Sequence, residues 1–217
     1  MEKLDKAYEA VDMLKALDLP ISKAQLDDIE RLEKEHGNVH REDLDSYFFE
    51  KCFINYTKRI MNIKQAKIRG EVILAKPVLL LAIIDKIDSA VYVGNEFSLT
   101  AWLEARYELL MRKYMRNSQF EKPTDISNPF WHLQSDGFWH LRLMENPREG
   151  VTPSKRWLKE KVTYAYFDED LWLLLKDRAW RTKLRDYIVE HKLTDDFWNG
   201  KMVAEGFGVL AMLLMAA

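Results

Sequence analysis

Cysteine and glycine are scarce in this chain, and no apolar run is long enough to cross a membrane. Cys52 is the single cysteine, which excludes an internal disulfide and a cysteine-based zinc site and suits a reducing compartment. The eight glycines are scattered singly, and neither a Walker loop nor a Gly-x-Gly-x-x-Gly motif occurs. The apolar runs 78–84 and 203–217 both fall short of the ~20 residues of a membrane helix. We therefore expect a cytoplasmic protein with no signal peptide and no membrane partner.

Charge is distributed unevenly along the chain, although its net value is only −2. Residues 1–50 hold 14 acidic and 7 basic side chains, whereas residues 51–70 hold six basic side chains and no acidic one. A block of one sign is typical either of a solvated helix face or of a surface that faces phosphates. With 47% hydrophobic residues and seven tryptophans, the chain is expected to bury a substantial core.

Hydrophobic spacing predicts a mainly helical chain. In the first 63 residues we expect two short helices and one long one, with a capping box at 22–25 and a terminating Gly37. Further helices are expected to start at or just after four positions: Pro77, Ser98, Asp168 and Arg178. The helix after Pro77 is expected to lie in the middle of the core, because residues 78–84 are all apolar. Ser98 and Asp168 are expected to cap the helices that follow them. The helix after Ser98 is expected to bury Trp102, Ala105, Leu109 and Leu110. The predicted fold class is mainly α (α+β), a helical domain with one or two small antiparallel β-hairpins.

Residues 129–143 predict a β-hairpin with a three-residue turn that Gly137 closes in the left-handed region. Side chains alternate along a strand, so this register puts the apolar side chains on one face. The opposite face carries four polar side chains: His132, Gln134, His140 and Arg142. His132 lies directly opposite His140 in this register. Three roles are open for the two imidazoles: they share a metal ion, they contact an anion or a base, or they are surface residues without a functional role. A metal site needs a third ligand, which the hairpin lacks.

Motifs of catalysis were not found in the sequence. Metal-nuclease motifs and serine or cysteine nucleophile motifs are absent, and the remaining histidines lie in unrelated contexts. The carboxylate triplet Asp168-Glu169-Asp170 offers oxygen ligands for Mg²⁺, but acids in the first turn of a helix explain it more simply. The sequence leaves enzyme activity open and favours its absence. We expect no cofactor, no catalytic residue and no metal.

Basic side chains outside the hairpin form two further groups. Arg178, Arg181 and Arg185 are predicted to share the side of the last helix that lies roughly opposite its apolar stripe. This pattern is common on solvent faces, although a guanidinium also suits a phosphate. Lys155 and Arg156 follow the predicted hairpin. The apolar segment after residue 193 is either a last core helix or a contact with a protein partner or a second copy.

Three segments, taken in order, resemble one family. Residues 76–85 are similar to a "KPLLLLxxID" helix and residues 129–139 to a "PFxHLxSDGFW" hairpin. Residues 162–172, followed by Arg181 and Arg185, are similar to a "YAYLDEELxxLL…R..LR" ending. These motifs are typical of bacterial HNH restriction endonucleases, in which this region is an N-terminal recognition domain placed before the nuclease. The best-understood relatives are sulfur-recognition domains that read phosphorothioate-modified DNA backbones.

The resemblance covers roughly residues 60–193 and implies a DNA-binding module that senses modified DNA. We expect no nuclease domain, because the sequence ends about 25 residues later. The expected division is an N-terminal helical arm at 1–63 that is acidic to about residue 50, a recognition domain at 64–193 and an apolar tail helix at 194–217.

The leading hypothesis is thus a non-catalytic DNA-binding module related to restriction-endonuclease recognition domains. The expected DNA contacts are His132, Gln134, His140, Arg142, Lys155, Arg156, Arg178, Arg181 and Arg185. The alternative is a protein-interaction or regulatory module that binds no nucleic acid. A third hypothesis is a degenerate nuclease that uses the carboxylates of 168–170. A protein partner or a homodimer bound through the tail is also expected.

Overall fold

The computed structural model describes residues 2–37, 42–89, 94–115, 122–147, 150 and 152–193. Within these ranges the chain forms helices and two small antiparallel sheets of two strands each, which confirms the predicted fold class. None of the helices in this part of the chain is long and apolar enough to span a membrane. The predicted tail helix at 194–217 lies outside the described residues.

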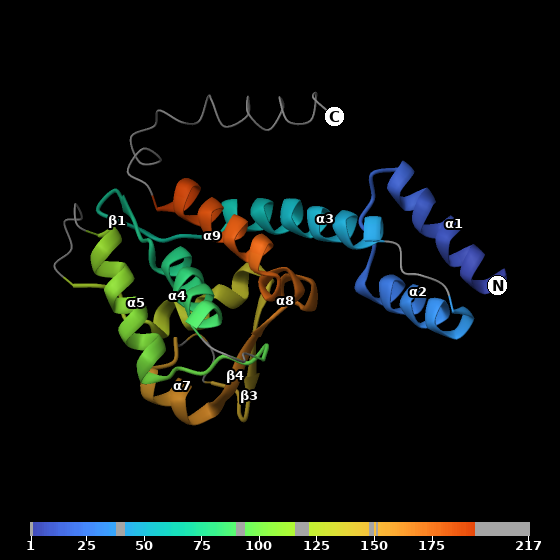
Figure 1. Ribbon diagram of the computed structural model, residues 1–217. Helices are drawn as coiled ribbons and strands as arrows, with labels where there is room; N and C mark the ends of the chain where they lie inside the picture. The colour runs from blue at the N-terminus through green and yellow to red at the C-terminus, as the bar shows by residue number, and fades with distance from the viewer. Residues whose placement is uncertain are drawn as a thin grey trace.

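The first two helices form an arm at one end of the molecule (Figure 1). Helix α1 (Glu2–Ala16) packs on α2 (Lys23–His36). The predicted capping box of Ser22 and Gln25 opens α2, and Gly37 ends it with a φ of 69°. The arm is joined to the next helix, α3 (Glu42–Met61), by polar contacts that include a hydrogen bond from the Tyr47 hydroxyl to the Leu19 carbonyl at 2.7 Å.

Helix α3 continues from the arm into the body of the molecule, where α8 (Glu169–Lys176) and α9 (Arg178–Lys192) pack against it. The Phe53 ring lies 5.6 Å from the Trp180 ring and 6.2 Å from the Tyr187 ring, centroid to centroid. Aromatic contacts of this kind hold one side of α3 to α9. On the opposite side of α3, Asn55, Lys58 and Asn62 are exposed.

Helix α4 (Ala75–Ser89) lies in the middle of the body, surrounded by α5 (Ala101–Tyr114), α6 (Ser127–His132), α8 and α9. Its segment 78–84 is buried on every side, as the run of apolar residues predicted. Helix α5 is capped by Thr100 and not by Ser98. The prediction that α5 buries Trp102, Ala105 and Leu109 is wrong, since all three are exposed, Trp102 by 42% and Leu109 by 54%. The burial of Leu110 is confirmed, and Leu103 faces the core with it.

Two short sheets complete the fold. Strands β1 (Lys67–Ile68) and β2 (Glu71–Val72) form a hairpin. Strand β3 (Trp139–Leu143) pairs antiparallel with β4 (Val162–Phe167), which follows the short helix α7 (Lys155–Lys161). Phe97 adds an isolated antiparallel bridge to Ala165 of β4. The sheet of β3 and β4 therefore gathers segments that are far apart in the sequence.

The predicted hairpin at 129–143 is wrong, because only its second half is a strand. Its first half forms α6 and a 3-10 turn, η1 (Leu133–Asp136). Pro129 suits the first turn of a helix, and Phe130 and Leu133, three residues apart, are both buried. Gly137 does adopt the expected left-handed conformation, with a φ of 81°. The predicted pairing of His132 with His140 does not occur.

Candidate nucleic-acid interface

The sheet of β3 and β4 has one buried face and one polar face. Trp139 and Phe167 are opposite one another and almost fully buried, so their face belongs to the core. Side chains alternate along a strand. The outer face consequently carries two cross-strand pairs: His140 with Tyr166, and Arg142 with Tyr164. The His140 and Tyr166 rings lie 5.1 Å apart, and the Tyr164 and Tyr166 rings 6.0 Å apart.

Arg142 is the cation of this outer face that is best placed to meet a ligand. Its side chain is exposed and makes no ion pair with any residue in the described ranges. It stands beside tyrosine rings, which combine an apolar surface with a hydroxyl that can donate or accept a hydrogen bond. This combination of imidazole, guanidinium and phenol can contact phosphates, sugars and base edges.

A cluster around Asp168 joins this face to α3. The Asp168 carboxylate lies 2.6 Å from His140 Nε2 and accepts hydrogen bonds from Arg59 Nη1 at 2.9 Å and Tyr56 Oη at 3.1 Å. Asp168 occupies the N-cap position of α8, but its side chain makes no capping hydrogen bond, contrary to the sequence prediction. The Arg59 guanidinium also lies over the ring of Tyr56 at 5.2 Å and that of Phe138 at 5.5 Å. Three donors thus offset the charge of this carboxylate and fix the His140 ring.

Burial shapes the ionisation of two groups in and beside the cluster. Burial, with the negative charge of Asp168 next in size, raises the pKa of the Tyr56 hydroxyl, which therefore stays a neutral hydrogen-bond donor. Burial also raises the pKa of Asp170, and the neighbouring carboxylates of Asp168 and Glu169 raise it further. Asp170 is thus held in an unfavourable environment for its charge.

The loop before β3 is tied to both α3 and α4. The Asp136 side chain is only 4% exposed and pairs with Lys76 Nζ at 2.7 Å. It also accepts a hydrogen bond from the backbone amide of Lys64 at 3.0 Å. A Cβ on Gly137 would lie 3.1 Å from Arg59 Nη2, so glycine allows the guanidinium to approach the backbone. The Ser-Asp-Gly sequence therefore positions the start of β3 and, with it, His140.

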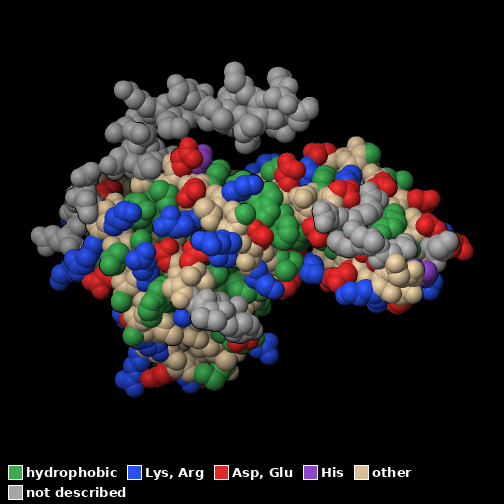
Figure 2. All heavy atoms as spheres, in the orientation of Figure 1, with side chains coloured by type: hydrophobic (Ala, Val, Ile, Leu, Met, Phe, Trp, Pro, Cys, Tyr) green, Lys and Arg blue, Asp and Glu red, His purple; other side chains and the backbone are tan. Residues whose placement is uncertain are grey.

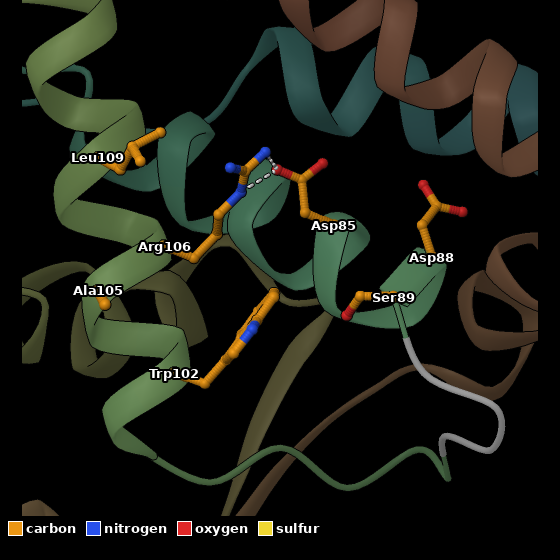
Figure 3. Close-up of a pocket in the computed structure, with 7 residues that line it drawn as sticks. All are labelled: Asp85, Asp88, Ser89, Trp102, Ala105, Arg106 and Leu109. Carbon is orange, nitrogen blue, oxygen red and sulfur yellow. Dashed lines mark hydrogen bonds and ion pairs between the residues drawn. The ribbon is translucent and has the colours of Figure 1, made fainter.

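The predicted arginine stripe of α9 does not form one solvent face. Arg181 is buried, pairs with Asp88 at 2.6 Å and donates to the Leu175 carbonyl at 2.7 Å, so it fastens α9 to α4 and α8. Arg185 reaches Asp85 at 3.5 Å. Figure 3 shows Asp85 and Arg106 pointing toward one another in a hollow between α4 and α5, with an ion-pair distance of 2.6 Å. These arginines pair with carboxylates of α4, and Arg178 is the exposed member of the stripe.

The other predicted contact residues lie on separate elements. His132 Nε2 lies 3.0 Å from Thr152 Oγ1, and burial followed by the charge of Lys76 lowers its pKa. Gln134 donates to the carbonyl of Trp131 at 2.9 Å. Lys155 bridges Glu104 at 3.1 Å and Asp125 at 3.0 Å, and Arg156 pairs with Glu160 at 2.8 Å along α7. Of the predicted contacts, the structure brings His140 and Arg142 together.

Sequence reasoning missed the aromatic partners of these two residues. Tyr164 and Tyr166 alternate with smaller or buried residues in the segment 162–167, which is the period of a half-buried strand. It also missed that Asn55, Lys58 and Asn62 share the exposed side of α3 next to Arg59. Figure 2 shows a notch in the outline of the molecule below α3, between the arm and the body that contains β3 and β4.

The carboxylate triplet at 168–170 does not have the geometry of a metal site. Both oxygens of Asp168 already face donors, Oδ1 toward His140 and Oδ2 toward Arg59 and Tyr56. Within the part of the chain that the structure describes, no three His, Cys, Asp or Glu side chains are placed to hold a metal ion. The cluster therefore has the character of a positioning network.

Comparisons with known proteins agree with the resemblance seen in the three motifs. The family model described as "ScoMcrA-like, DNA sulfur-binding domain" matches residues 55–202. A solved structure, "Sulfur binding domain of ScoMcrA complexed with phosphorothioated DNA", has 21% identity and a TM-score of 0.50, covering 73% of this chain and 98% of that chain. No curated protein matches.

The structural likeness shows a shared fold, and the family match begins inside α3, after the arm helices α1 and α2. The match spans well over half of the sequence. The chain therefore belongs to the family of ScoMcrA-like DNA sulfur-binding domains.

Proposed function

We propose that this chain is a non-catalytic DNA-binding module that senses a modified DNA backbone, with phosphorothioate as the modification. The observation that carries the proposal is the family match at 55–202, since the solved relative is described in complex with phosphorothioated DNA. The outer face of β3 and β4 is the surface whose chemistry fits a nucleic acid best. The role suits the cytoplasmic location expected from the sequence.

The proposed contacts divide by chemistry. Arg142 and Lys58 are exposed cations without an ion pair to any described residue, so they are suited to phosphates. His140, Tyr164 and Tyr166 offer rings and hydrogen-bonding groups to sugars and base edges. Phosphate contacts release counterions, so the affinity is expected to fall steeply with salt concentration.

Asp168 lies at the edge of this face, and its negative charge would repel phosphates if the carboxylate had no partners. The carboxylate instead accepts hydrogen bonds from Arg59 and Tyr56 and contacts the His140 ring. The cluster therefore holds His140 in place and cancels a charge that opposes DNA binding. Asp168 and Arg59 are proposed as positioning residues for the interface.

Seven of the nine residues predicted from the sequence are left out of this contact face, and three of them, His132, Gln134 and Arg156, contact other groups of the protein. Arg181, Arg185 and Lys155 are engaged with carboxylates of the protein. Arg178 is exposed but sits at the start of α9, three residues before Arg181, on the side of α9 that meets α4. The contact face thus excludes the α9 stripe.

Fluorescence anisotropy with a labelled phosphorothioate duplex tests where the DNA sits. Arg142→Ala is expected to weaken binding and to lower the slope of log affinity against log salt by about one, because it removes one phosphate contact. Arg178→Ala removes the same charge from an exposed site on α9 and is expected to bind like the wild type. Equal losses for the two variants would contradict the assignment of the interface to β3 and β4.

The alternative, a protein-interaction or regulatory module that binds no nucleic acid, has one observation in its favour. Met13, Leu17 and Leu19 lie within seven residues of one another in the arm and are 66%, 62% and 45% exposed. Exposed apolar surface of this kind is typical of protein contacts. The division into arm (1–63), domain (64–193) and tail (194–217) stays a prediction. A protein partner or a homodimer bound through the tail also stays a prediction, since it concerns residues outside the described ones.

A further inference from the structure

The β1–β2 hairpin is an exposed structure with a turn of two residues, Arg69 and Gly70. Both have positive φ, 51° and 84°, which is the backbone of a tight hairpin turn. Strand β1 is exposed along its whole length, and Ile68 near the turn is 48% exposed. The hairpin is therefore a short projection.

The base of the hairpin is fixed to the body. The amide of Ile73 donates to the Ala66 carbonyl at 2.8 Å, and Gln65 Nε2 donates to the Ile73 carbonyl at 3.1 Å. The buried Lys192 of α9 reaches the Met61 carbonyl at 2.6 Å and Gln65 Oε1 at 3.4 Å. A projection that is anchored in this way loses little further conformational entropy when it binds a ligand.

The hairpin carries cations that the protein itself leaves unneutralised. In the acid-free block 51–70, Arg59 is paired with Asp168 and Lys51 with Asp18. Lys64 and Lys67 are exposed and form no ion pair with any residue that the structure describes. Lys67 belongs to β1, and Lys64 stands just before it, so the two charges lie at the hairpin and not on the α3 face.

The hairpin also lies within one turn of DNA from the proposed interface. The Lys64 amide contacts Asp136, His140 lies four positions after Asp136, and Ile68 lies four positions after Lys64. At about 3.3 Å per extended residue, Ile68 is at most roughly 30 Å from His140. This is about nine base pairs at about 3.4 Å each, less than one helical turn of about 34 Å.

We propose that the β1–β2 hairpin is a second DNA contact, which binds backbone phosphates of the same duplex within one helical turn of the site on β3 and β4. The inference rests on the proposed function. It adds a contact with the DNA backbone that depends neither on the base sequence nor on the modification.

The test uses a duplex of about 20 base pairs, with and without the modification, and measures the anisotropy of the full chain bound to it across a salt series. The variant is Lys64→Ala with Lys67→Ala, and the matched control is Lys3→Ala with Lys34→Ala, which removes the same charge from the arm. The hairpin variant is expected to bind more weakly, and the slope of log affinity against log salt is expected to fall by about two, equally for modified and unmodified DNA. The arm control is expected to bind like the wild type.

Two results would overturn the hairpin contact while leaving the proposed function intact. One is a hairpin variant that keeps the wild-type affinity and salt slope. The other is a loss of affinity that is equally large in the arm control. A wild-type chain that binds neither duplex contradicts the proposed function itself, and the hairpin contact with it.

Discussion

At the scale of single residues, Gly137 and Arg59 depend on one another. Gly137 has a φ of 81°, and its missing side chain leaves room for the Arg59 guanidinium that holds Asp168. The sequence predicted the left-handed glycine, because Asp-Gly pairs mark turns. It did not predict Arg59 as its neighbour, because a contact between residues 78 positions apart has no local signal.

Gly137→Ala is expected to destabilise the fold by more than Gly70→Ala. Both glycines have positive φ, which costs an alanine about 1–2 kcal/mol, but a Cβ at Gly70 meets open space whereas one at Gly137 meets Arg59 at 3.1 Å. Urea unfolding of the two variants measures the difference. Equal costs would show that Arg59 moves away freely and does not constrain this loop.

At the scale of elements, the sequence succeeded where the signal is local. The capping box of α2, the terminating Gly37 and the all-round burial of α4 follow from neighbouring residues. The hairpin at 129–143 failed because apolar residues in its first half suit a short helix as well as a strand, and the strand partner, β4, lies about 20 residues further along. Strand β3 was therefore found, but its partner was not.

The first turn of α8 gives the clearest expectation for pH dependence. Burial and the carboxylates of Asp168 and Glu169 raise the pKa of Asp170 above its ordinary value of 3.8. A carboxyl with a raised pKa in the folded state favours the fold below its ordinary pKa and loses that contribution as the pH rises through the folded value.

Asp170→Asn is therefore expected to raise the melting temperature at neutral pH, and this gain is expected to vanish as the pH falls below about 3.8. Thermal unfolding from pH 3 to pH 7 measures it, with the exposed Asp186→Asn of α9 as a control of equal charge change. A gain that persists at acidic pH would mean that packing, and not ionisation, explains the effect.

At the scale of the whole molecule, the distribution of charge in the sequence acquires a spatial meaning. The acidic segment 1–50 forms the arm and the start of α3, ahead of the family match. The acid-free block 51–70 divides into cations that the protein pairs internally, such as Arg59, and exposed ones at Lys58, Lys64 and Lys67. The sequence indicated a basic surface, but only the structure separates its internal pairs from the charges left for a ligand.

The central claim is that the chain binds DNA and prefers a phosphorothioate backbone, and a paired binding measurement tests it most directly. Two duplexes of one sequence, with and without a phosphorothioate link, are titrated with the full chain across a salt series. We predict tighter binding to the modified duplex, with salt slopes that are nearly the same for both because the phosphate contacts are shared. Binding to neither duplex at low salt would contradict DNA binding itself and favour the protein-interaction alternative. Equal affinities for the two duplexes would contradict the preference for the modification.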